Sequence, residues 1–343
     1  MKKTLAILVV FDYPNPPPAD GWESVLADDG WLCEKNVTAA LRELGHEVRI
    51  LGLRDSIEPL LAEIRERRPD IVFNLVEAFA EDRQHEANLA GLLELLGVPY
   101  TGSRPACLTI CRNKAFTKRI LTPHRIKLPG SIVLVRGQQP KTLKPLRFPV
   151  FVKPLGLEGS DGIAQSSFTE TPEACLERVR FLHESLETDA LIEEYIEGRE
   201  FYSAVLGNDR LRVLPLREMV FDNFPEERPR FATFKAKWDD AFRKRWGIRN
   251  TFAAPIPESL ARRIASISKT AYRALDLKGY GRVDLRVTPE GEIYLIEVNP
   301  NPNLAIDDEV AEAAKKASIG YEQLIAQVLA SGLALARPPV RGS

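Results

Sequence analysis

An excess of charge of either sign is what this sequence most clearly lacks. It contains 47 Lys and Arg residues against 48 Asp and Glu residues, which gives a formal net charge of −1 over 343 residues. A surface that binds nucleic acid or an anionic membrane needs clustered positive charge. No nucleic-acid partner and no membrane partner are therefore expected.

Cysteine is also scarce. The four cysteines form no CxxC pair, and no histidine stands near them at a zinc-site spacing. No apolar run is long enough to cross a bilayer. Reduced thiols in the cytoplasm are the expected state.

Two common phosphate-binding motifs are missing. No GxGxxG follows the first predicted strand, and no GxxxxGK precedes a Ser or Thr. The first absence argues against a dinucleotide site, and the second argues against a Walker loop. A nucleotide site in this chain has to be built from other residues.

The length and the element pattern indicate an α/β fold with two or three lobes. In the first hundred residues, apolar runs typical of strands alternate with amphipathic helical segments. The predicted strands are 4–11, 47–51 and 71–76, and the predicted helices are 34–45, 56–68 and 87–96. This alternation predicts a parallel sheet with flanking helices.

The pattern changes at about Ser103. Further helices are predicted over 105–121, 171–185, 257–275 and 308–330, and strands over 148–154 and 201–206. The charged segment 221–251 is interpreted as a functional loop or a disordered insertion. The predicted domains are 1–103, 104–187 and 188–333, followed by a loose tail at 334–343.

The segment 279–301 predicts two strands joined by a Gly-bearing turn at 289–292. A turn centred between residues 290 and 291 places Asp284 opposite Glu297 and Arg282 opposite Asn299. Because side chains alternate along a strand, Arg282 and Asp284 share one face. The paired side chains therefore gather on one side of the hairpin.

Directly opposed carboxylates repel each other and destabilise a sheet. A hard cation between Asp284 and Glu297 removes that conflict. Two carboxylates and the amide oxygen of Asn299 form an all-oxygen ligand set that suits Mg²⁺, whose remaining ligands are usually phosphates and water. The alternative is that these side chains form a solvated outer face of the hairpin.

Other residues suit a nucleotide. Lys153 ends a predicted strand and precedes a Gly- and Ser-containing loop, so cation and backbone donors can meet a polyphosphate there. Lys114 is a second candidate phosphate contact. The run Glu193-Glu194-Tyr195-Ile196 can present backbone groups and a carboxylate to adenine, and Glu200 can accept the ribose hydroxyls. Each residue alone is more often a surface charge.

Taken together and in order, these segments resemble the ATP-grasp superfamily and, within it, the D-alanine–D-alanine ligases. The matching residues are Gly97-Val98-Pro99-Tyr100-Thr101-Gly102-Ser103, Lys114, Phe148 to Pro154, Glu158-Gly159-Ser160, Glu193 to Glu200, Ala236-Lys237-Trp238 and Gly281 to Asn299. The resemblance spans roughly residues 70–330. It implies a three-lobed fold with ATP held between two antiparallel sheets.

The resemblance also implies a role for each matching side chain. Lys114 and Lys153 would contact phosphates beneath a loop around Ser160, and Lys237 would close on the γ-phosphate. Residues Glu193 to Ile196 would recognise adenine, and Glu200 would bind ribose. Arg282 would stabilise the charge on the attacked acyl carbon, and Asp284, Glu297 and Asn299 would hold two Mg²⁺ ions, with Mn²⁺ as a substitute. The implied reaction is the ADP-forming joining of a small-molecule carboxylate to a small-molecule amine through an acyl phosphate. A homodimer is common among similar proteins.

The departures from the family lie among the residues that would bind the two substrates. The family's Gly-Gly-x-Ser loop after the first strand is absent from 13–22, and its His-Gly after the third strand is Glu77-Ala78 here. Asp307 or Asp308 stands where the family has a Ser that caps the acceptor's carboxylate.

An anion in place of that hydroxyl would repel an amino acid's carboxylate. We therefore hypothesise that the acceptor is not D-alanine, and that it carries an extra cationic group or lacks a free carboxylate nearby. Glu77 can likewise hold a substrate ammonium. The alternative, given equal weight, is that Asp307 and Asp308 cap the following helix.

Three functions compete. The first is an ATP-dependent carboxylate–amine ligase acting on substrates other than two D-alanines, and the sequence favours it. The second is a D-alanine–D-alanine ligase with a divergent pocket, against which the missing first loop and Glu77 argue. The third is a non-catalytic ATP-binding protein, which has no need of Arg282 beside metal ligands.

Overall fold

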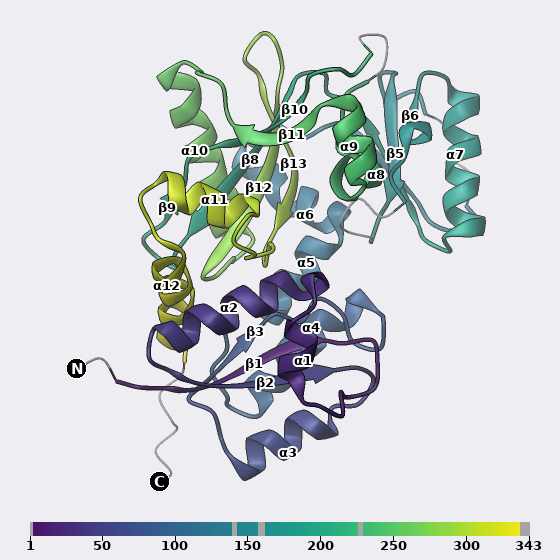
Figure 1. Cartoon of the computed structure of the whole chain (residues 1–343). Coiled ribbons are helices and arrows are strands. Elements are labelled where there is room, and N and C mark those ends of the chain that lie inside the picture. The colour runs from purple at the N-terminus through teal and green to yellow at the C-terminus, as the bar shows by residue number, and fades with distance from the viewer. Residues whose placement is uncertain (1–2, 139–142, 157–161, 226–228, 337–343) are drawn as a thin grey trace.

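A computed structural model describes residues 3–138, 143–156, 162–225 and 229–336. The N-terminal lobe is built on a parallel three-stranded sheet in the order β2-β1-β3 (Figure 1). Its strands are β1 (Ala6–Asp12), β2 (Glu47–Leu53) and β3 (Ile71–Asn74), and its main helices are α2 (Leu32–Glu43), α3 (Glu58–Glu66) and α4 (Glu86–Leu95), with a short α1 (Trp22–Leu26). The predicted parallel sheet is confirmed, and β1 is buried as a near-continuous apolar run.

A four-stranded antiparallel sheet follows in the chain. It has the order β4-β7-β5-β6 and consists of β4 (Ser131–Leu134), β5 (Val150–Pro154), β6 (Phe168–Thr169) and β7 (Ala190–Glu194), with α7 (Pro172–Ser185) packed against it. Strand β7 lies beyond residue 187, where the predicted central domain ends. The sheet therefore continues across that boundary, and the division into domains stays a prediction.

A six-stranded antiparallel sheet forms the largest layer. It contains β8 (Arg199–Leu206), β9 (Arg212–Val213), β10 (Arg217–Phe221), β11 (Ile248–Phe252), β12 (Tyr280–Val287) and β13 (Ile293–Asn299), and α10 (Glu258–Ala274) packs on it. The main path runs β11-β10-β8-β12-β13, with β9 paired to β8. The two antiparallel sheets expected from the resemblance are thus present.

Two helices predicted as continuous are each divided. The segment 105–121 forms α5 (Pro105–Arg112) and α6 (Lys114–Leu121), because Asn113 leaves the helical conformation and its side chain accepts hydrogen bonds from two backbone N–H groups of α6. The segment 308–330 forms α11 (Glu309–Lys316) and α12 (Tyr321–Ala334), which are separated by a backbone turn with positive φ at Ser318. The single-helix predictions were wrong at both places.

The charged segment 221–251 is largely regular structure in its described part. It carries α8 (Phe234–Trp238) and α9 (Asp240–Trp246) between β10 and β11. Thr233 and Asp239 cap these two short helices with their side chains. The interpretation as a disordered insertion was wrong for these residues, and the functional-loop alternative stays open.

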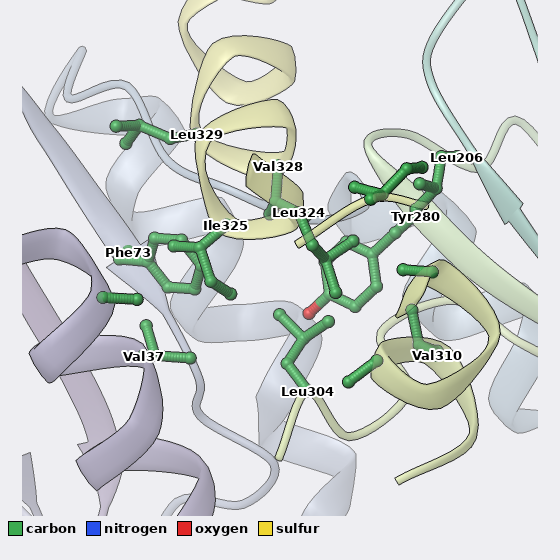
Figure 2. Close-up of a cluster of buried hydrophobic side chains, with 14 of the residues drawn as sticks. Val37, Phe73, Leu206, Tyr280, Leu304, Val310, Leu324, Ile325, Val328 and Leu329 are labelled. Atoms are coloured by element: carbon green, nitrogen blue, oxygen red, sulfur yellow. The ribbon is translucent and has the colours of Figure 1, made fainter. Parts of the chain in front are cut away.

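Helix α12 packs between the N-terminal lobe and the six-stranded sheet (Figure 2). Its buried side chains Leu324, Ile325 and Val328 pack into one cluster with Phe73 of the N-terminal sheet and Tyr280 of β12. Fully burying one such aliphatic side chain contributes about 1.5–3 kcal/mol. This cluster therefore fixes the N-terminal lobe against the six-stranded sheet.

No helix in the described ranges is long and apolar enough to cross a membrane. Cys33, Cys107, Cys111 and Cys175 are free thiols. The cytoplasmic location and the homodimer stay predictions.

Replacing Ile325 by Ala should lower the free energy of unfolding by about 2–5 kcal/mol, because it leaves a cavity in a fully buried cluster. Gln323→Ala, at an exposed position of the same helix, should change it by no more than about 0.5 kcal/mol. Urea unfolding followed by circular dichroism measures both. Equal effects of the two substitutions would show that α12 does not hold the lobes together.

Candidate active site

The hairpin of β12 and β13 places the predicted carboxylates opposite each other. Asp284 pairs with Glu297 and Arg282 pairs with Asn299, as the sequence predicts. The register shifts next to Asp284, however, so that Leu285 pairs with Leu295 and Ile296 is left as a bulge. The turn is therefore centred at residue 290, half a residue earlier than predicted, and the bulge restores the expected pairs.

The bulge changes which side chains reach the site. Strict alternation would send Ile296 and Glu297 to opposite faces of the sheet. Both line the same cavity instead. The hairpin thereby offers an apolar contact and a carboxylate from adjacent positions.

That cavity, here called the nucleotide cavity, lies between the two antiparallel sheets. It brings together most of the residues that were predicted to bind ATP or metal: Lys114, Lys153, Glu193, Glu194, Tyr195, Ile196, Glu200, Lys237, Asp284 and Glu297. Phe151 and Phe231 add apolar wall, with ring centroids 4.7 Å apart. Ser160 lies outside the described residues, and its predicted role is untested.

Lys114 and Lys153 of the nucleotide cavity, and Lys118 beside it, are paired with carboxylates that line the cavity. Lys114 Nζ lies 3.0 Å from Glu297 Oε1. Lys118 and Lys153 both hold Glu193, with Lys118 Nζ 2.5 Å from Glu193 Oε1. Burial raises the pKa of Glu193, but the two ammonium groups outweigh it and lower that pKa overall. Phosphate oxygens entering the cavity would compete with these carboxylates for the same lysines.

Asp284 is held by two neighbours. Arg282 donates from Nε to Oδ1 at 2.8 Å and from Nη2 to Oδ2 at 3.0 Å, and Asn299 Nδ2 donates to Oδ2 at 3.2 Å. Burial raises the pKa of Asp284 even though Arg282 opposes that shift. Across the hairpin, burial also disfavours the charged form of Glu297, but Lys114, Lys153 and Lys237 overcome it and lower the pKa to about 2.

These residues fit a hard divalent cation. The two carboxylates face each other in a buried ladder with an amide beside them, which is an oxygen-rich set of the kind that binds Mg²⁺. Within the described ranges no group of three or more His, Cys, Asp or Glu side chains could hold a metal. A cation here would therefore need Asn299, substrate oxygens or water to complete its coordination.

Comparison with known proteins decides the family. The family described as "D-ala D-ala ligase C-terminus" matches residues 135–330, more than half of the chain. A protein of Sinorhizobium fredii, named only as uncharacterized protein y4sG, is 32% identical over 93% of this chain and 91% of its own length. The D-alanine–D-alanine ligase of Bordetella petrii is 28% identical over 94% of this chain and 93% of its own.

The chain belongs to the D-alanine–D-alanine ligase family of ATP-grasp enzymes. Solved structures agree with this fold. The D-alanine–D-alanine ligase of Bacillus anthracis superposes with a TM-score of 0.77 at 20% identity, over 97% of this chain and 99% of that one. The VanG D-Ala:D-Ser ligase of Enterococcus faecalis superposes with a TM-score of 0.71 at 19% identity, over 96% and 100%.

Arg286, which lines this ligase's nucleotide cavity, and Lys118, which pairs with Glu193 of that cavity, were given no role from the sequence. Arg286 donates to Ile196 O at 2.8 Å and to Glu200 Oε2 at 2.9 Å, and its guanidinium stacks over the Tyr195 ring at 5.1 Å. It follows Arg282 and Asp284 on the same strand face, so the period of two could have indicated it. Lys118 follows Lys114 by one helical turn of α6, where residues four apart share a face.

A second and larger cavity, here called the substrate cavity, adjoins the first. All four predicted substrate residues line it: Glu77, Arg282, Asp307 and Asp308. Lys237 borders both cavities, and Phe234 and Trp238 of α8 line the substrate cavity as well. The substrate roles of these side chains stay predictions.

The structure separates the two aspartates of the helix start. Asp308 is the N-cap of α11 and accepts a hydrogen bond from Glu309 N at 2.6 Å, whereas Asp307 is exposed and makes no such cap. Capping is confirmed for Asp308 alone. It does not exclude a substrate contact, because both aspartates line the substrate cavity.

The pKa values of Asp308 and its neighbour Glu309 shift in opposite directions. Burial raises the pKa of Asp308 well above its usual range. Burial also opposes ionisation of Glu309, but hydrogen bonding from Asp308 and the guanidinium of Arg282 lower its pKa to about 2. Glu309 Oε2 lies 3.8 Å from Arg282 Nη1. Sequence reasoning considered Asp307 and Asp308 and missed Glu309, the carboxyl group that lies beside Arg282.

Glu77 lies near two further acids, Asp12 and Glu34, where β1 and β3 end. Glu77 N donates to Asp12 Oδ1 at 2.7 Å, and Glu77 itself lies 3.6 Å from Arg83. Glu34, in the first turn of α2, lines a small cavity together with Glu77. Burial, and then the carboxylates of Asp12 and Glu77, raise the pKa of Glu34 to about 7.

The raised pKa of Glu34 has a consequence for stability. Between the ordinary value of 4.5 and about 7, the folded state holds a proton that the unfolded state has lost. Stability should therefore fall as pH rises through this window, by at most about 3 kcal/mol in total. Glu34→Gln should remove this slope, as measured by urea unfolding between pH 4.5 and 8.

The exposed Glu43 on the same helix gives the matched control. Glu43→Gln should keep the wild-type pH profile. If Glu34→Gln and the wild type run parallel over the whole window, the acids around Glu34 do not interact as described.

Proposed function

We propose that this ligase joins a small-molecule carboxylate to a small-molecule amine with conversion of ATP to ADP, and that its substrates are not two D-alanines. The observation that carries the proposal is the meeting of the two cavities at the β12–β13 hairpin. Lys237 borders both, Asp284 and Glu297 face the nucleotide cavity, and Arg282 and Asn299 face the substrate cavity. A γ-phosphate and a substrate carboxylate can meet only at such a junction.

The chemistry follows from these groups. A carboxylate oxygen of the donor attacks the γ-phosphorus of ATP, the bond to the bridging oxygen breaks, and ADP leaves with an acyl phosphate formed. The amine of the acceptor then attacks the acyl carbon, phosphate leaves, and the amine loses a proton as the amide forms. Lys114, Lys153 and Lys237 are placed to neutralise phosphate oxygens, and Arg282 to stabilise charge at the acyl group.

Asp284, Glu297 and Asn299 would hold Mg²⁺, which when bound screens the phosphate oxygens from the attacking carboxylate. The surrounding side chains would orient the nucleotide and exclude water from the site. Arg286 donates a hydrogen bond to Glu200, where ribose would bind, and residues Glu193 to Ile196 line the cavity wall that adenine would contact. Burial of the site protects an acyl phosphate from hydrolysis.

The substrate half supports a donor and acceptor other than D-alanine. Glu77 stands in place of the family's His-Gly segment, and an ionised Glu309 lies beside Arg282. A carboxylate brought next to Arg282 would meet that negative charge. The second candidate is a D-alanine–D-alanine ligase with a divergent pocket, which relatives such as the Bordetella petrii protein favour by their names.

Phosphate release from ATP and Mg²⁺ tests the proposal across single amino acids, amino-acid pairs and diamines. We expect turnover with a pair other than D-alanine alone. Asp284→Asn should lower that turnover by about a hundredfold or more, because it removes charge at the developing transition state. Asp222→Asn, at an exposed aspartate paired with Arg249, is the matched control and should keep it.

The outcomes separate the candidate functions. Turnover with D-alanine alone would establish the second candidate and contradict the proposal that the substrates are not two D-alanines. ATP binding without turnover for any pair would favour a non-catalytic ATP-binding protein.

Asp308→Ser tests the acceptor side directly. The substitution restores the hydroxyl that the family has there, and Ser remains a good N-cap, so folding should be little affected. We expect the preference among acceptor amines, measured as the ratio of kcat/KM values, to change about tenfold or more. An unchanged preference with wild-type thermal stability would mean that Asp308 only caps α11.

A further inference from the structure

Arg217 is one of four arginines among the described residues that line the substrate cavity; the others are Arg83, Arg243 and Arg282. It lies on β10, and only 7% of the residue is exposed. Its side chain lines the cavity together with Arg282. Neither the nucleotide site nor the chemistry described above uses it.

The donors of Arg217 are poorly satisfied. Nη2 donates to the backbone oxygen of Asn250 at 3.1 Å, and Nη1 has only the Glu312 carboxylate at 3.9 Å. Nε has no hydrogen-bond partner among the residues that the structure describes. The guanidinium otherwise stacks over Phe252 at 4.7 Å. A buried guanidinium with so few acceptors is costly unless an anion completes its contacts.

Arg282 is in the opposite situation. Two of its nitrogens are bound by Asp284, its third faces Glu309 at 3.8 Å, and its guanidinium lies 5.1 Å from the Tyr202 ring centroid. A substrate carboxylate that approached Arg282 would have to compete with Asp284 and come close to Glu309. Arg217 also helps to lower the pKa of Glu309, but the carboxylate of Glu312 lies 3.9 Å from its Nη1, so Arg217 is the less tightly paired of the two arginines.

A short row of side chains separates the two arginines. Glu309 lies between Arg282 and Asn250, since it contacts the guanidinium of Arg282 and accepts a hydrogen bond from Asn250 Nδ2. The backbone oxygen of Asn250 in turn binds Arg217. Arg217 of β10 and Arg282 of β12 lie on the two strands that flank β8, whose backbones are about 10 Å apart. In an α-amino acid one carbon separates amine and carboxylate, which is too short to span that separation past the Glu309 side chain.

We propose that Arg217 binds the carboxylate of the acceptor, and that the acceptor's reacting amine is separated from this carboxylate by more than one carbon. The acceptor class is therefore an ω-amino acid rather than an α-amino acid. This assignment rests on the proposed ligase function. It places the amine near Arg282, where the acyl group reacts, and the carboxylate at Arg217 beyond Glu309.

Calorimetric titration tests the assignment on full-length protein saturated with Mg²⁺ and a non-hydrolysable ATP analogue. The probes are glycine, D-alanine, β-alanine, γ-aminobutyrate and 5-aminopentanoate, with propylamine and butylamine as partners that lack the carboxylate. We expect an ω-amino acid to bind at least tenfold more tightly than glycine, D-alanine and the amines. Arg217→Gln should weaken that binding about 10- to 100-fold, as expected for loss of a charged hydrogen bond.

Two further variants serve as controls for the charge of Arg217 and for the loss of an arginine elsewhere. Arg217→Lys retains the charge and should recover part of the affinity. Arg249→Gln removes an exposed arginine that pairs with Asp222, and should bind like the wild type. Thermal unfolding and the affinity for the ATP analogue, which should be unchanged in all variants, show that each protein is folded.

Three results would overturn the assignment: tightest binding of glycine or D-alanine, equal binding of an ω-amino acid to folded Arg217→Gln, or no binding of any amino acid to the wild type. Failure of the wild type to bind the ATP analogue would instead overturn the proposed ligase function.

Discussion

The structure depends on a conflict between two like charges. Asp284 and Glu297 face each other in a buried ladder, where opposed carboxylates repel. Each is neutralised by a different cation, Asp284 by Arg282 of its own strand and Glu297 by Lys114 at the start of α6. Because Lys114 comes from a segment outside the six-stranded sheet, the charge of the hairpin also ties α6 to that sheet. The same principle repeats at Glu193, which joins Lys118 of α6 to Lys153 of β5.

The residue pairs at the site end of this hairpin could be predicted from the sequence, although the assumed position of the turn was not correct. A Gly-bearing turn between two β-rich runs gives the strands, and counting outward gives the pairs. The turn is half a residue earlier than the count assumed, and the bulge at Ile296 compensates. Nothing local marks Ile296 as a bulge, since it is an ordinary β-branched strand residue. Bulges arise from the fit between strands, and one sequence read alone does not contain that fit.

Elements with local signals were predictable, and contacts between distant segments were not. Strands β1 to β3 and the helices between them follow from apolar periodicity, whereas Asn113 divides a helix through a cap that competes with a continuous apolar pattern. Asn301 makes contacts between distant segments that no local sequence signal indicates. Its side chain accepts from Ser103 N at 2.9 Å and donates to Glu86 at 3.3 Å, so it links the end of β13 to the N-terminal lobe. Gly102 has φ of +95°, and a Cβ there would lie 2.7 Å from Asn301 Oδ1, which explains the glycine.

The substrate half shows why residue identity alone misjudges charge. The sequence has three adjacent acids, Asp307, Asp308 and Glu309, and the repulsion was predicted for Asp307 or Asp308. Burial raises the pKa of Asp308, whereas the hydrogen bond from Asp308 and the guanidinium of Arg282 lower the pKa of Glu309, so negative charge is favoured at Glu309, one residue further along the chain. That charge lies directly beside the arginine that would otherwise attract a carboxylate. An anionic group of the substrate would meet that charge at Arg282, whereas Arg217, in the same described cavity wall, is a buried guanidinium whose Nε has no hydrogen-bond partner.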